Sequence, residues 1–327
     1  MRRHRAGPLA TRAGRWHTSS PMGRFDDRAT RPPRGPADLL RWRLDKLRGV
    51  GAARVKDEIT GAPLRPNDGA ALRDLPASLT WIGHASFVLR LGGRVTAIDP
   101  IWSERIHGVV RRLVAPGVAL EDVPRIETVL VSHNHFDHLD VPTLRRIGPS
   151  ARYLVPLGNA GVLREAGLSD VVELDWWETH REGDVEYTLV PARHWSMRMP
   201  WTRNEMLWGG WVIRAPEGVA YHSGDTAAFE GFAEIGRRCG PIDWAMLPVG
   251  AYEPRWFMEP QHMNPDDAVA AFEALGARTF VAMHWGTFKL TDEALHLPPA
   301  RTRELWLERG LDPARLWILD VGETRGL

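Results

Sequence analysis

From residue 79 onward, short apolar segments with the period of strands alternate with segments that have the period of helices. Residues 79–83, 86–91 and 94–99 alternate or run apolar between glycines, which predicts antiparallel strands. Because the predicted strands fall into two groups, the pattern indicates an α/β fold with two sheets and helices outside them. Further strands are predicted at 126–132, 151–156, 186–192, 205–215, 218–225, 242–250 and 278–285, and helices at 159–166, 232–238, 265–275 and 300–309.

The chain before these strands has a different character. Residues 1–36 are rich in Arg, Pro, Gly, Ser and Thr without any hydrophobic period, so they are predicted to form an irregular basic arm. A helix and linker are predicted at 37–75, followed by one large domain at 76–327.

The predicted helix is amphipathic, because Leu40, Leu44 and Leu47 follow the spacing i, i+4 and i+7 among basic residues and Trp42. A helix of this kind can lie in a membrane interface or pack on its own domain. The sequence favours neither alternative.

The charge of the chain is unevenly distributed. Residues 1–56 contain 15 Lys and Arg against 4 Asp, a net charge of +11, so the remainder carries −10 within a total of +1. A basic arm on an acidic body is typical of proteins with an anionic partner, either lipid headgroups or nucleic acid, although a solvated tail has the same composition. With Cys239 as the single cysteine and no apolar run of about 20 residues, we expect a cytoplasmic protein or one on a membrane surface facing the cytoplasm.

One loop concentrates residues that bind metals. The sequence His133-Asn134-His135-Phe136-Asp137-His138 directly follows the predicted strand at 126–132. A strand end can aim several side chains at one point above a sheet, and imidazole with carboxylate suits zinc, with iron or manganese as alternatives.

Further ligand types occur after other predicted strands, at His194, Asp225 and His284. Asp99 also follows a strand and is predicted to accept a hydrogen bond from a ligand imidazole, unless it only forms a turn before Pro100. We predict that His133, His135 and His194 hold one ion, that Asp137, His138 and His284 hold a second, and that Asp225 bridges the two.

The charge of such a centre indicates the kind of substrate. Two Zn²⁺ ions, two Asp carboxylates and a bridging hydroxide leave a net charge of +1, which favours an anionic substrate such as a phosphodiester. The metals also lower the pKa of bound water to about 7, so that hydroxide is available at neutral pH.

The ordered ligands resemble those of the metallo-β-lactamase superfamily, whose fold is a four-layer αββα sandwich. Over about residues 75–327, the sequence is similar to the family of N-acyl-phosphatidylethanolamine-hydrolysing phospholipases D. The motifs that carry this likeness include WIGHAS (81–86), LDWWE (174–178), PARHW (191–195), GAYEPRWFM (250–258), QHMNPDDAV (261–269) and HWGTF (284–288).

The resemblance implies a two-zinc phosphodiesterase that releases phosphatidic acid and an N-acylethanolamine through attack by the bridging hydroxide. It implies catalytic roles for Asp137, Asp225 and His262, with His262 contacting the phosphate or the leaving oxygen. His262 could instead cap the helix that begins at Pro265. The resemblance implies a phospholipid substrate and no nucleic acid, while the charge of the basic N-terminal segment suggests a membrane surface as a partner; a homodimer is a further possibility. We further expect Trp201, Trp208 and Trp256 to line an apolar entry for lipid.

Other functions share parts of this pattern. A sugar-phosphate lactonase of the same superfamily is the strongest rival, but it would need a small polar pocket. A β-lactamase with a cysteine ligand fits less well, because Cys239 follows a helix. A nuclease would need an added domain that the sequence does not show, and a lipid-binding scaffold would not need the full set of ligands.

Overall fold

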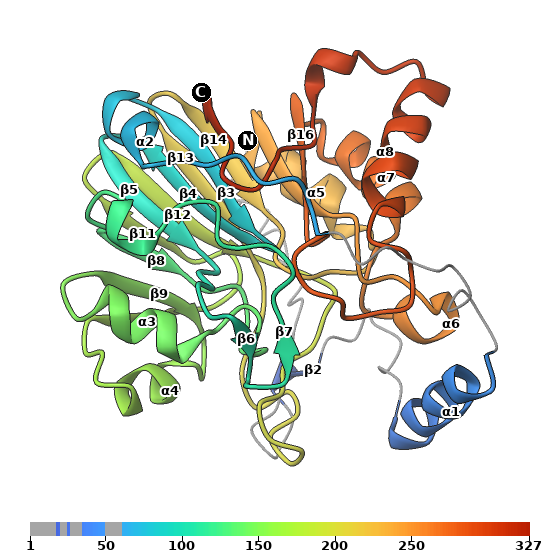
Figure 1. The fold of residues 1–327 in the computed structure, drawn as a ribbon. Helices are drawn as coiled ribbons and strands as arrows, with labels where there is room; N and C mark the ends of the chain where they lie inside the picture. The colour runs from blue at the N-terminus through green and yellow to red at the C-terminus, as the bar shows by residue number, and fades with distance from the viewer. Residues whose placement is uncertain (1–17, 20–24, 27–34, 50–60) are drawn as a thin grey trace, which may run out of the picture.

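The computed structural model describes Thr18–Ser19, Phe25–Asp26 and residues 35–49 and 61–327. Most of residues 1–36, the predicted basic arm, lie outside the described part of the chain. Two seven-stranded sheets form the centre of the molecule (Figure 1). The first sheet has the order β10-β9-β8-β5-β4-β3-β18, with β3 Ser78–Gly83, β4 Ser86–Leu91, β5 Arg94–Ile98, β8 Thr128–Leu130, β9 Arg152–Pro156, β10 Val171–Leu174 and β18 Thr324–Gly326.

The second sheet has the order β11-β12-β13-β14-β15-β16-β17. In both sheets an antiparallel part continues into a parallel part: β3, β4 and β5 are antiparallel, and β5, β8, β9 and β10 are parallel. The strands of the second sheet are β11 Thr179–Glu182, β12 Val185–Val190, β13 Gly210–Ala215, β14 Gly218–His222, β15 Trp244–Pro248, β16 Thr279–Met283 and β17 Leu316–Trp317.

Alternation along the strands creates two cores. In β4, Phe87 and Leu89 face the core between the sheets, while Val88 faces the core under the helices on the other side. The helices α2 Ala70–Asp74, α3 Val141–Ile147 and α4 Ala160–Glu165 cover the first sheet. The helices α5 Gly231–Cys239, α7 Pro265–Leu275 and α8 Leu297–Glu308 cover the second. The predicted four-layer αββα sandwich is therefore confirmed.

Capping residues determine where helix α7 begins and ends. Helix α7 begins after Asn264, whose side chain accepts a hydrogen bond from the Asp267 backbone at 2.8 Å, and Asp267 accepts one from the Asn264 backbone at 3.3 Å. It ends at Gly276, which has a φ of 63°. Because Asn264 caps this helix, the alternative in which His262 is the cap is wrong.

Several elements were not predicted. They include the hairpin formed by β6 Arg105–Ile106 and β7 Val110–Arg111, the short helix α6 Arg255–Met258, and the two-residue pair β1 Thr18–Ser19 and β2 Phe25–Asp26. In the segment predicted as a linker, Ala62 and Leu72 pack into the two cores. Packing of the main domain therefore begins before residue 76.

Helix α1 spans Pro36–Leu47 and contacts the main domain through Trp42. The Trp42 ring lies 5.0 Å from that of Phe257, and its Nε1 donates to Asp292 Oδ2 at 2.5 Å. The leucines of the predicted apolar stripe do not pack on the domain: Leu40 and Leu47 are 59% and 85% exposed. The described helices include none that is long and apolar enough to span a membrane.

Candidate metal centre

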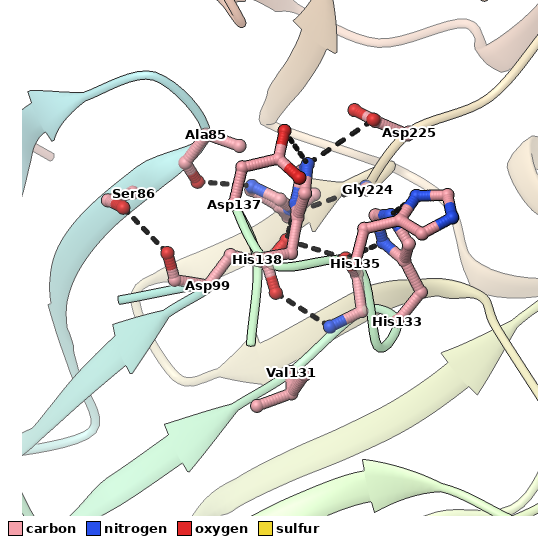
Figure 2. Close-up of polar contacts among 12 residues, drawn as sticks. Ala85, Ser86, Asp99, Val131, His133, His135, Asp137, His138, Gly224 and Asp225 are labelled. Atoms are coloured by element: carbon pink, nitrogen blue, oxygen red, sulfur yellow. Dashed lines mark hydrogen bonds and ion pairs between the residues drawn. The ribbon is translucent and has the colours of Figure 1, made fainter. Parts of the chain in front are cut away.

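The predicted metal ligands converge at one edge of the sandwich. The loop 133–138 follows β8, His194 follows β12, Asp225 follows β14 and His284 follows β16. These strand ends lie at the same edge, so side chains far apart in sequence meet there. Figure 2 shows Asp137, His138 and Asp225 turned toward one another, with His133 and His135 beside them.

Three imidazoles form the first cluster. His135 Nδ1 lies 2.9 Å from His133 Nε2 and 3.2 Å from His194 Nε2. His194 Nδ1 lies 2.9 Å from the Gln261 carbonyl, to which it must donate, so the neutral ring directs its Nε2 lone pair into the cluster. The three residues that the sequence assigned to one ion therefore lie close enough together to bind one cation.

A second cluster is built from carboxylates and imidazoles. The two oxygens of Asp225 lie 3.2 Å from His138 Nε2 and 3.1 Å from His284 Nε2. Asp137 Oδ2 lies 3.6 Å from His138 Nε2 and 3.9 Å from His284 Nε2. Asp225 Oδ2 also lies 3.9 Å from His194 Nε2 of the first cluster, which places this carboxylate between the two clusters.

The unsatisfied atoms fit a pair of metal ions. His135 Nε2, His138 Nε2, Asp225 Oδ1 and both nitrogens of His284 are buried and have no hydrogen-bond partner among the described residues. His138 donates from Nδ1 to Asp99, so its Nε2 lone pair faces a carboxylate oxygen, a contact that only a proton or a metal ion stabilises. Burial lowers the pKa of His138, but the carboxylates of Asp225, Asp137 and Asp99 raise it well above its ordinary value. The negative electrostatic potential of these three carboxylates also attracts a metal cation.

Asp99 anchors the loop 133–138, called the metal loop below, through hydrogen bonds to Ser132 and His138. Its Oδ2 accepts from His138 Nδ1 at 2.7 Å and from Ser132 Oγ at 2.6 Å, and its Oδ1 accepts from the Ser132 backbone at 2.6 Å. Asp99 itself has a φ of 42°, a left-handed conformation that non-glycine residues rarely adopt. The Asp99 carboxylate therefore fixes the tautomer and orientation of the imidazole of His138, one of the candidate ligands.

His262 lies beside the two clusters without being part of the predicted ligand set. Its Nε2 is 4.0 Å from Asp225 Oδ2, and its ring centroid is 5.2 Å from that of His194. Its Nδ1 is buried without a hydrogen-bond partner. Burial lowers the pKa of His262 well below its ordinary value, so the ring is neutral at neutral pH.

A cavity of about 380 Å³ opens onto the clusters. Its lining includes Asp137, Asp225 and His262, and the rest of the lining is largely apolar, as at Phe257 and Met258. The tryptophans that line it are Trp42 and Trp195. The expectation for Trp208 is wrong: it is 1% exposed and donates to the Ala192 carbonyl in the core. Trp201 and Trp256 are not among the lining residues either.

Sequence reasoning missed His84, which belongs to the same site. Its Nε2 lies 3.0 Å from Asp137 Oδ2, and its ring centroid is 4.0 Å from that of His284. His84 and Gly83 have φ values of 55° and 117°, so the chain turns sharply after β3. The signal was a histidine directly after β3, which runs in the same direction as β5, the strand that leads to Asp99, with β4 between the two.

We expect His84→Ala to weaken the metal affinity of the Asp137 cluster by about 10- to 100-fold, because the hydrogen bond that orients this carboxylate is lost. Competitive titration of the metal-free protein with zinc measures both affinities. His180→Ala, which removes a partly exposed histidine on β11, is the matched control. Unchanged zinc affinities in His84→Ala would show that His84 does not position the ligand.

The metal-free protein should lose stability on acidification. Burial lowers the pKa of six histidines in the described part of the chain, to about 4 for His84 and His194 and about 3 for His135, whereas the pKa of His138 is raised. Below the ordinary value of 6.5, the unfolded chain therefore binds more protons than the folded protein, and the free energy of unfolding falls as the pH falls toward about 4. Each such histidine contributes at most about 1.4 kcal/mol per pH unit.

Urea unfolding of chelator-treated protein at several pH values between neutral and mildly acidic measures this effect. We expect the midpoint to move to lower urea as the pH decreases. A midpoint that rises or stays constant would mean that these histidines are protonated in the folded state.

Comparisons with known proteins agree with this geometry. A family model described as a β-lactamase superfamily domain matches residues 94–285. Igni18, a metallo hydrolase from Ignicoccus hospitalis, has the same fold, with a TM-score of 0.59 at 22% identity over 76% of this chain and 97% of that one. The chain is therefore a metal-dependent hydrolase of the metallo-β-lactamase superfamily.

The N-acyl-phosphatidylethanolamine-hydrolyzing phospholipase D 1 of Caenorhabditis elegans is 34% identical over 75% of this chain and 74% of its own length. The mitochondrial protein of the same name from Saccharomyces cerevisiae is 31% identical over 83% of this chain, but the match covers only 60% of its own length. The chain belongs to the family of these N-acyl-phosphatidylethanolamine-hydrolysing phospholipases D.

Proposed function

We propose that this chain is a two-zinc phosphodiesterase that hydrolyses N-acylated phosphatidylethanolamine to phosphatidic acid and an N-acylethanolamine. The observation that carries the proposal is the largely apolar cavity whose lining includes residues of the predicted metal centre together with His262. An apolar cavity suits acyl chains, whereas the reacting phosphate needs the polar end.

The donor set supports zinc. His133, His135 and His194 would hold one ion, and Asp137, His138 and His284 the other, with Asp225 between them. When bound, two zinc ions supply hydroxide from water at neutral pH and offset the charge that develops on phosphate. The resulting net positive charge favours the anionic phosphodiester over a neutral lipid.

Two side chains of the protein would assist the reaction: His262 as a hydrogen-bond donor to the substrate, and Arg198 as a support of the loop 133–138. As a neutral imidazole, His262 has one N–H group that can donate to a phosphate oxygen or to the oxygen of the leaving ethanolamide. Arg198 stabilises the metal loop, because its Nη1 donates to the carbonyls of Asn134 and Leu139 at 2.9 and 3.0 Å. The guanidinium also lies 4.2 Å from the centre of the Phe136 ring, which lines the cavity.

A substrate panel tests the proposal. Zinc-loaded protein would be incubated with N-acyl-phosphatidylethanolamine in mixed micelles, with ordinary phosphatidylethanolamine and with a phosphorylated sugar lactone, and the products identified by mass spectrometry. We expect release of N-acylethanolamine and phosphatidic acid, lost on chelation and restored by zinc. If only the lactone were hydrolysed, the protein would be a sugar-phosphate lactonase and the proposed lipid substrate would be wrong.

A further inference from the structure

The exposed apolar residues of this protein gather around the cavity. Of the ten large apolar side chains that are exposed in the described part of the chain, four lie on α1, one on the β6–β7 hairpin and two in the loop after His194. Each of these three segments also contributes a residue to the cavity wall, namely Trp42, Ile106 and Met197. Figure 1 shows α1 and the β6–β7 hairpin at the same lower end of the molecule, away from α8.

Helix α1 presents its leucines away from the domain. Asp38, Trp42 and Asp45 are partly buried and follow one face of the helix, and Trp42 carries the contacts with Phe257 and Asp292. Leu40, Leu44 and Leu47 follow a face displaced by two residues, about 200° around the helix, and are 59%, 40% and 85% exposed. A contiguous apolar stripe in water is typical of an interaction surface.

The charges beside the stripe indicate what it contacts. On α1 and directly after it, Arg41, Arg43, Lys46 and Arg48 are exposed. Arg41 lies 3.7 Å from Asp45, and Lys46 is paired with Asp292 of the main domain at 2.9 Å, so Arg43 and Arg48 contribute most of the outward charge here. On the hairpin, Arg105 and Arg111 are exposed beside Val109, which is 75% exposed. Leucines flanked by cations match the interface of an anionic bilayer, where acyl chains lie beneath negative headgroups.

We propose that α1, the tip of the β6–β7 hairpin at Val109 and the loop at Met199 form one docking surface that inserts into anionic lipid bilayers. This surface would place the cavity at the lipid interface, so that a lipid enters without crossing bulk water. The purpose of the docking rests on the proposed function, but the docking itself does not require catalysis. A second copy of the chain on this surface is the competing occupant.

Co-sedimentation of the full chain with vesicles tests the surface. Vesicles of phosphatidylcholine alone would be compared with vesicles that also contain phosphatidylglycerol. The test variant carries Leu44→Ser and Leu47→Ser. The matched control carries Leu64→Ser and Leu307→Ser, two leucines that are 46% and 67% exposed elsewhere on the surface. Circular dichroism establishes that both variants are folded.

We expect the wild type and the control to bind the phosphatidylglycerol vesicles, more weakly as salt is added. The test variant should bind about tenfold less tightly for each leucine replaced. Equal binding of test and control variants would overturn the proposal. So would a change from dimer to monomer in the test variant, seen by analytical ultracentrifugation, with vesicle binding unchanged.

The failures of the two proposals are distinguishable. Hydrolysis of N-acyl-phosphatidylethanolamine in detergent micelles together with leucine-independent vesicle binding would remove the docking surface and leave the enzyme. Leucine-dependent binding without any hydrolysis would leave the docking surface and remove the proposed substrate.

Discussion

Asp225→Asn should reduce lipid hydrolysis by at least about 10³-fold, the largest effect of any single substitution in this site. Asp225 Oδ1 lies 3.1 Å from His284 Nε2 of the second cluster and Asp225 Oδ2 lies 3.9 Å from His194 Nε2 of the first, so one carboxylate lies between both clusters. An asparagine has one oxygen and no negative charge, and it cannot replace both contacts. Steady-state kinetics together with metal analysis by mass spectrometry measures the effect.

The matched control for this substitution is Asp170→Asn. Asp170 forms an ion pair with Arg152 at 3.0 Å on the surface, and its side chain is 47% exposed. We expect the control to retain activity and metal content. If Asp225→Asn kept full activity with two equivalents of metal, Asp225 would not be the bridging ligand.

His262→Gln should lower kcat by about 10²-fold while leaving the zinc content unchanged. His262 lines the cavity, and its neutral ring supplies an N–H group next to the predicted reaction centre. It is not among the seven predicted ligands, although its nitrogen is near enough to His194 and Asp225 to join a metal cluster. Metal analysis therefore separates a role toward the substrate from a role as a ligand.

An exposed histidine at the start of α8 provides the comparison, as His296→Gln. It should behave as the wild type. Loss of one zinc equivalent in His262→Gln would identify His262 as a ligand, and unchanged kcat would remove it from the reaction.

The sequence predicted most of the fold because strand alternation and helix capping are local. The Asn264, Pro265 and Asp267 signals gave the start of α7 without any tertiary information. The hairpin at 105–111 could not be predicted in this way, since strands of two residues carry no period. Helix α3 was missed as well, even though Pro142 lies in its first turn.

The convergence of the candidate ligands could be predicted because each lies in a segment that follows a strand, and these strand ends meet at one edge of the sandwich. His84 also follows a strand, but its role depends on the direction of the turn after Gly83, which only the tertiary structure fixes. The orientation of α1 was equally inaccessible. Its leucine period was compatible with packing on the domain and with a membrane interface; in the structure Trp42 makes the contact with the domain and the leucines remain exposed.

The most direct test of the proposed function is the position of the oxygen that water supplies. Zinc-loaded protein would hydrolyse N-acyl-phosphatidylethanolamine in water labelled with heavy oxygen, and both products would be weighed by mass spectrometry. If water attacks phosphorus and the bond to the ethanolamide oxygen breaks, the label appears in phosphatidic acid and the N-acylethanolamine is unlabelled. Label in the N-acylethanolamine, or no product from protein that holds two zinc ions, would contradict a phospholipase D reaction at this centre.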